Sequence, residues 1–117
     1  MATFTKVLLS GSTQGKGIKV VETATAGTTI HTAVSGTSSI DEVWLYAHNT
    51  SSAVVKLTLE WGEATAPDGN IEINVGQEGT GLILIAAGIP LQNGLVIKAF
   101  AATANVINIF GYVNRIA

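Results

Sequence analysis

The sequence predicts an all-β protein, a single two-sheet β-sandwich of jelly-roll type with about nine short strands. Three observations support this prediction. Segments with apolar residues at alternate positions recur about every ten residues, Gly, Asn, Ser or Pro separates them, and no window has the 3.6-residue period of an amphipathic helix. An immunoglobulin-like Greek key is the main alternative topology. The 117 residues fit one domain, residues 1–117, because two domains would each bury too small a core.

The expected strands fill most of the chain. They cover residues 3–9, 18–23, 28–34, 42–49, 54–61, 71–75, 82–87, 95–101 and 106–116. Residues 66–70 and 92–94 carry the strongest turn signals between strands. Gly111 interrupts the last strand and predicts a bulge or the close approach of another backbone. Residues 1–6 are expected to form a terminal arm that becomes ordered on docking.

Side-chain alternation predicts how the central strands are buried. In residues 42–49 both faces carry bulky side chains, so this strand is expected inside a sheet and covered on both sides. In the next strand, the face with Lys56, Thr58 and Glu60 is expected to be wet. The apolar run at residues 82–90 is expected to be a buried strand and its turn.

Composition argues against several classes of partner. The formal net charge is −2, from eight acidic and six basic residues, so no basic patch for nucleic acid is expected. The apolar runs are too short for a membrane helix, and the first residues lack the pattern of a signal peptide. The chain has no Cys for disulfides or thiolate metal sites. Its low charge leaves neutral sheet edges, which favour a homo-oligomer.

No group of side chains predicts a reaction. His31 and His48 have no further ligand on their own strand faces, so both are expected to be partly exposed structural residues. Asp41, Glu60 and Glu63 are expected to be solvated carboxylates at strand ends, because the chain has no long loops to build a cleft around them. We therefore expect no enzyme, no cofactor and no metal. A small hydrolase that uses these carboxylates is the least favoured alternative.

Four segments follow one another in a recognisable order. They are residues 42–49 (EVWLYAHN), 54–59 (VVKLTL), 89–99 (IPLQNGLVIKA) and 102–112 (ATANVINIFGY). In this pattern of strands and turns the chain resembles small tailed-bacteriophage virion proteins of the capsid decoration (cement) type. The resemblance implies a jelly roll that binds the major capsid protein on the virion surface, as a symmetric oligomer with a trimer favoured, after synthesis in the host cytoplasm. Related sandwiches in head fibres and tails imply the alternative, an adhesin component that binds host-surface carbohydrate.

Five side chains are the candidate interface residues. Phe4 and Lys6 belong to the expected arm, and Trp44 and Tyr46 share one face of a strand. Trp61 ends the following strand, which we expect to lie beside the first. Aromatic side chains are enriched in protein-binding hot spots, and they also stack on sugar rings. The same residues therefore serve both the decoration protein and the adhesin hypotheses.

Overall fold

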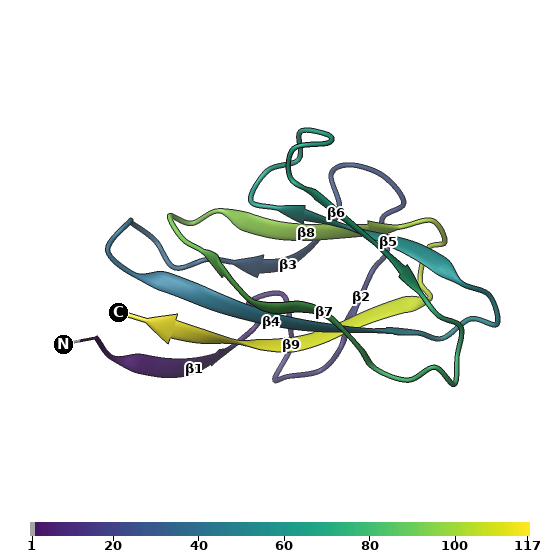
Figure 1. The fold of residues 1–117 in the computed structure, drawn as a ribbon, viewed down its shortest axis with the longest axis horizontal. Helices are drawn as coiled ribbons and strands as arrows, with labels where there is room; N and C mark the ends of the chain where they lie inside the picture. The colour runs from purple at the N-terminus through teal and green to yellow at the C-terminus, as the bar shows by residue number, and fades with distance from the viewer. Residues whose placement is uncertain (1) are drawn as a thin grey trace.

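The computed structural model describes residues 2–117 as nine β-strands in two antiparallel sheets (Figure 1). The strands are β1 (Phe4–Leu8), β2 (Ile18–Lys19), β3 (Thr28–Thr32), β4 (Ile40–Asn49), β5 (Val55–Trp61), β6 (Asn70–Val75), β7 (Ile83–Leu91), β8 (Val96–Ala101) and β9 (Ile107–Ile116). Within residues 2–117, no helix is long and apolar enough to cross a membrane.

The strand order confirms the two-sheet sandwich. One sheet has the order β1-β9-β4-β7, with β2 also paired to β9, and we call it the β9 sheet. The other has the order β3-β8-β5-β6, and we call it the β8 sheet. Along the chain, successive strands lie in opposite sheets, except that β1 and β2 share one sheet and β5 and β6 share the other. This alternation is that of a jelly roll rather than an immunoglobulin-like Greek key.

The core lies between the sheets and follows from the alternation of side chains. Val43, Leu45 and Ala47 of β4 point inward and are fully buried. Side chains of the same kind come from β5 and β8 of the facing sheet and from β9 beside β4: Leu57, Leu59, Ile97, Ala99, Ala101, Ile107, Ile109 and Val113. Burial of each such aliphatic side chain contributes about 1.5–3 kcal/mol, so this layer is the main source of stability.

Gly111 lies where β9 passes closest to β4. It is the register partner of Leu45, and a Cβ at this position would collide with the carbonyl oxygen of Trp44. The close backbone approach expected at this glycine is therefore confirmed.

The first residues form a strand and not a free arm. Phe4 to Leu8 pair antiparallel with Ile116 to Tyr112 of β9. Thr3 and Ala117 exchange two backbone hydrogen bonds of 2.7 and 2.9 Å beyond this ladder. Residues 3–6 of the expected arm are thus held by the end of the chain and the edge of β9, which would otherwise be unpaired there. Met1 lies outside the described residues.

The strand expected to be buried at residues 82–90 is instead β7, an edge strand of the β9 sheet. Its register against β4 shifts twice, and it contains Pro90. Leu82 and Leu84 are about half exposed, at 56% and 48%. The prediction of burial was wrong because Leu84, the register partner of Tyr46, points to the outer face of the sheet, and β7 lies at the sheet edge, where less of the chain surrounds it.

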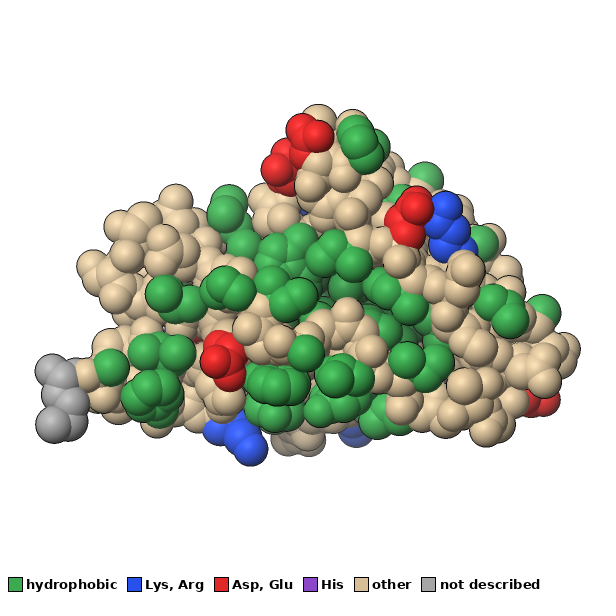
Figure 2. Space-filling view, in the orientation of Figure 1, with side chains coloured by type: hydrophobic (Ala, Val, Ile, Leu, Met, Phe, Trp, Pro, Cys, Tyr) green, Lys and Arg blue, Asp and Glu red, His purple; other side chains and the backbone are tan. Residues whose placement is uncertain are grey.

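The sandwich has one covered and one open long side. On the covered side, the connection from β1 to β3 spans both sheets. The Gly11 amide donates a hydrogen bond to the Ile30 carbonyl of β3, and the Val20 amide donates one to the Ile107 carbonyl of β9. On the other side β6 and β7 are the outer strands of different sheets and have no ladder between them. We call this the open side. Half-buried apolar side chains at the end of β5 and in β6 and β7 line it: Trp61, Ile71, Ile73, Ile83, Ile85, Ile89 and Leu91. Figure 2 shows a broad apolar hollow on this side of the molecule.

We expect Gly111→Ala to lower the free energy of unfolding by about 1–3 kcal/mol, because the added methyl must displace a backbone carbonyl inside the sheet. Denaturant titration measures this loss. Gly76→Ala is the matched control, since its methyl would meet only the movable side chain of Thr80. Equal losses in the two variants would contradict the close approach as the cause.

Candidate functional site

The outer face of the β9 sheet carries a cluster of aromatic residues. Residues of β4 and β9 that alternate with the buried Val43 and Val113 point away from the core. The register places them in rows with β1, so that residues distant in sequence become neighbours. We call this surface the aromatic face, and its residues are Phe4, Lys6, Leu8, Glu42, Trp44, Tyr46, Phe110, Tyr112 and Asn114.

Four groups form a continuous stack across the aromatic face. The Lys6 Nζ lies 4.7 Å from the centroid of the Tyr112 ring. The Tyr112 and Trp44 rings are nearly parallel, at 7°, with centroids 6.2 Å apart. The indole then lies against Gly88 of β7, where a Cβ would come within 3.1 Å of Trp44 Cζ2. Because the strand order is β1-β9-β4-β7, Lys6 and Trp44 approach Tyr112 from opposite sides.

Hydrogen bonds fix the polar edge of this stack. The Trp44 Nε1–H donates to Glu42 Oε1 at 2.9 Å, and the Asn114 amide donates to the same oxygen at 3.1 Å. The bond from Trp44, followed by that from Asn114, lowers the pKa of Glu42 despite the opposing effect of desolvation. Glu42 therefore remains an acceptor that orients the indole.

The structure brings four of the five candidate interface residues together. Phe4, Lys6, Trp44 and Tyr46 all lie on the aromatic face, and Phe4 is 71% exposed. Trp61 lies elsewhere, in the β8 sheet, where it packs on the core and donates its Nε1–H to the Pro90 carbonyl at 3.3 Å. The expectation that its strand adjoins that of Trp44 was wrong, because the chain crosses between sheets after β4.

Sequence reasoning missed the aromatic residues of the last strand. Phe110 and Tyr112 lie directly opposite Tyr46 and Trp44 in the ladder between β4 and β9. Their alternation with the buried Ile109 and Val113 could have placed them on the outer face. Only the strand pairing, which is not local in sequence, could have placed them beside Trp44.

Asp41 is buried in a polar network and is not solvated as expected. Arg115 donates to both carboxylate oxygens, at 2.7 and 3.0 Å. His31 Nε2 lies 2.8 Å from Oδ2, and the Val34 amide donates to this oxygen at 3.0 Å. His31 and Asp41 are fully buried, and the network joins β3 of one sheet to β4 and β9 of the other.

Hydrogen bonding sets the proton positions in this network. The Ser10 amide donates to His31 Nδ1 at 3.0 Å, so the ring carries its proton on Nε2 and donates it to Asp41. Burial by itself would raise the pKa of Asp41, but the bonds from Arg115, His31 and Val34 outweigh it and lower that pKa. The expected partial exposure of His31 was wrong. His48 is half-buried, with Nδ1 3.3 Å from the Gly81 carbonyl oxygen.

Glu60 is also buried, although its strand face was expected to be wet. The segment from Glu22 to Gly27 crosses the outer face of the β8 sheet. The Gly27 amide and the Thr25 hydroxyl donate to the Glu60 carboxylate at 2.7 and 2.9 Å. Thr58 of the same face is 3% exposed. This segment covers Glu60, which anchors it.

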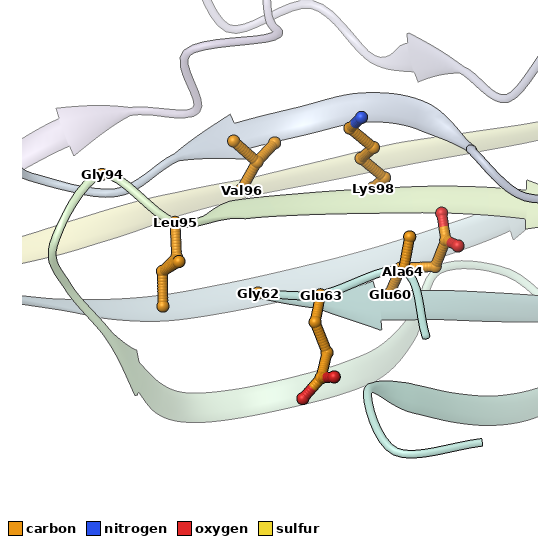
Figure 3. Close-up of a pocket in the computed structure, with 8 residues that line it drawn as sticks. All are labelled: Glu60, Gly62, Glu63, Ala64, Gly94, Leu95, Val96 and Lys98. Atoms are coloured by element: carbon orange, nitrogen blue, oxygen red, sulfur yellow. The ribbon is translucent and has the colours of Figure 1, made fainter. Parts of the chain in front are cut away.

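Glu60 and Glu63 line a shallow depression of about 240 Å³. Figure 3 shows that their carboxylates point in different directions. Because Glu60 already binds two donors and does not converge with Glu63, the two lack the arrangement of an acid and a base across a cleft. In the part of the chain that the structure describes, no three His, Asp or Glu side chains are grouped as a metal site.

Comparisons of the chain with protein-family models, curated proteins and solved structures find no match. The geometry of the aromatic face is therefore the main structural basis for a functional hypothesis.

We expect Asp41→Asn to lower the free energy of unfolding by on the order of 3 kcal/mol at neutral pH, because Arg115 loses its buried partner. The folded-state pKa of Asp41 lies below its ordinary value of 3.8. The contribution of Asp41 to the free energy of unfolding is thus complete above pH 3.8 and is lost as the pH falls through the lower, folded-state pKa. The difference between wild type and Asp41→Asn, measured by denaturation at several pH values, should shrink in acid. A constant difference would contradict this assignment.

We expect Glu60→Gln to cost about 1–2 kcal/mol, because two hydrogen bonds lose their charged acceptor. Hydrogen exchange and proteolysis should increase at residues 22–27. The nearby exposed Glu63→Gln is the control and should stay within about 0.5 kcal/mol of wild type. Unchanged protection of residues 22–27 in Glu60→Gln would show that Glu60 does not anchor this segment.

Proposed function

We propose that this protein is a non-enzymatic virion structural protein of a tailed bacteriophage, which binds and stabilises the major capsid shell as a symmetric oligomer. The observation that carries this proposal is the stack of Lys6, Tyr112, Trp44 and Gly88 on the aromatic face. It supports binding to a protein surface. The capsid as the partner rests on the resemblance of the strand and turn pattern to decoration proteins.

The stack favours a protein ligand over a sugar. A sugar ring stacks on the open face of an aromatic ring. Lys6 and Trp44 flank the Tyr112 ring, and Tyr112 and Gly88 flank the indole. Each ring therefore has neighbours on two sides. Flanked rings with an ammonium beside them suit contact with the mixed polar and apolar surface of a protein.

The aromatic face is also preorganised for binding. Trp44 is held by Tyr112, Gly88 and the carboxylate of Glu42. Such side chains lose little conformational freedom on association, so more of the contact energy appears as affinity. Phe4 and Leu8 extend the face toward the sheet edge and are 71% and 53% exposed. Phe4 lies two register rows from Tyr112 and Trp44, beyond Lys6, and aromatic residues grouped on one face are typical of the core of a protein interface.

A decoration protein needs no catalytic group, because its work is to connect neighbouring shell subunits. Its contacts are repeated by the symmetry of the shell, so an interface that is weak in one copy becomes strong in an oligomer. A neutral jelly roll with one rigid, exposed face meets these requirements. The carbohydrate-binding adhesin remains the alternative, and it would use Trp44 and Tyr46 of the same face.

The test uses heads of the encoding phage assembled without this protein. We expect purified protein to bind these heads and to raise their resistance to heat. Phe4→Ala should weaken binding about tenfold or more, because it removes an exposed aromatic anchor. Val54→Ala is the control, since Val54 is similarly exposed, at 62%, but lies before β5 and outside the aromatic face.

Absence of both binding and added heat resistance with the wild-type protein would overturn the proposal. Glycan binding that is lost in Trp44→Ala, without binding to heads, would establish the adhesin alternative instead. Equal effects of Phe4→Ala and Val54→Ala on head binding would show that the aromatic face is not the contact.

A further inference from the structure

We infer that the open side of the sandwich is the contact between copies of this chain. The half-buried apolar side chains of β6 and β7 are covered there by a second copy in the oligomer. This inference deepens the proposed function, which requires a symmetric oligomer, by assigning the surface that forms it. The aromatic face of each copy then stays free for another protein.

The open side is continuous with the hydrophobic core. Ile71 and Ile73 of β6 and Ile83 and Ile89 of β7 pack against the buried core residues and are only partly covered. An interface that remains permanently formed resembles a core divided between two chains. The open side resembles such a divided core, since its apolar side chains belong to the core and are covered by this chain only in part.

Charge favours a copy of the same chain as the occupant. β7 contains no charged residue. β6 contains only Glu72, whose carboxylate is paired with Lys56 at 2.9 Å. Figure 2 shows the charged side chains at the margins of the apolar hollow. A patch without unpaired charges can contact another copy of the chain, in a two-fold or a three-fold arrangement, without repulsion between like charges.

The aromatic face differs from the open side in this respect. Lys6 and Glu42 both lie on it, and Asn114 adds a polar amide. Contacts between copies of one chain are more apolar than contacts with transient partners. The apolar open side and the mixed aromatic face therefore match two different kinds of contact.

The molecular face that contains the open side is large enough for a stable contact. The molecule measures 48 × 28 × 21 Å, and Figure 2 looks down its shortest axis onto the largest face, which contains the open side. A standard interface buries about 800 Å² on each partner. A contact over a little more than half of this face reaches that size. A second apolar hollow, of about 360 Å³, extends the surface at the end of β7 and is lined by Ile40, Pro90, Leu91, Gln92 and Leu95.

The test is the mass of the purified protein in solution, measured by light scattering and by sedimentation over a range of concentrations. The chain has a mass of 12.0 kDa, and we expect the wild type to form an assembly of two or three copies. Ile73→Lys, in the middle of the open side, and Leu95→Lys, at its end, should weaken the assembly by about tenfold or more. Leu95 is 44% exposed, so this variant keeps its fold even if Ile73→Lys does not.

Val21→Lys is the matched control. Val21 is 47% exposed and lies between β2 and β3, on the covered side, so its variant should assemble like the wild type. A monomeric wild type at all concentrations would overturn the inference, and so would a folded Leu95→Lys that keeps the wild-type mass and stability of assembly. Because no heads are present, failure here leaves the head-binding result of Phe4→Ala to judge the proposed function separately.

Discussion

One buried carboxylate, that of Asp41, fixes how the two sheets pack together. Arg115 reaches it from the same sheet, His31 from the other sheet, and Val34 from the connection between β3 and β4. A charge buried without such donors costs several kcal/mol. The sheets can therefore approach at this end only in the relative position that brings all the donors to the carboxylate. A hydrophobic contact, which has no direction, would allow them to slide.

The same network determines the surface on the far side of the sheet. Asp41 and Arg115 are register partners, and pairing by one residue more or less would turn every side chain of β4 to the opposite face. With Asp41 held inside, Glu42 and Trp44 must point outward and meet Asn114 and Tyr112. The arrangement of the aromatic face thus follows from a polar contact in the interior.

The sequence predicted the strands well because side-chain alternation and turn residues are local signals. All nine strands lie where they were expected, although β2 is shorter and β7 longer than predicted. The burial of charged residues was predicted poorly. Asp41 shares the alternation of Val43 and Leu45, so its inward direction could have been predicted from the sequence. Glu60 is instead covered by residues 22–27, a segment distant in sequence whose position no local pattern indicates. The burial of His31 was not predicted because a register shift in β3 buries two successive residues, which breaks the alternation of the strand. The neighbours of Trp44 depend on pairing between distant strands, which alternation does not specify.

The irregular edge of β7 has a consequence for how copies of the chain can associate. A straight, regular edge strand is a template to which further strands add without limit, and a chain with 47% hydrophobic and 12% charged residues has few charges to prevent this. β7 contains two register shifts, and Pro90 supplies no N–H, so its outer edge cannot extend a regular ladder. Backbone geometry therefore disfavours strand addition at β7, while side-chain packing over the β6–β7 margin remains available. In the proposed oligomer, contact across this margin would therefore use side-chain packing and not a ladder shared at β7.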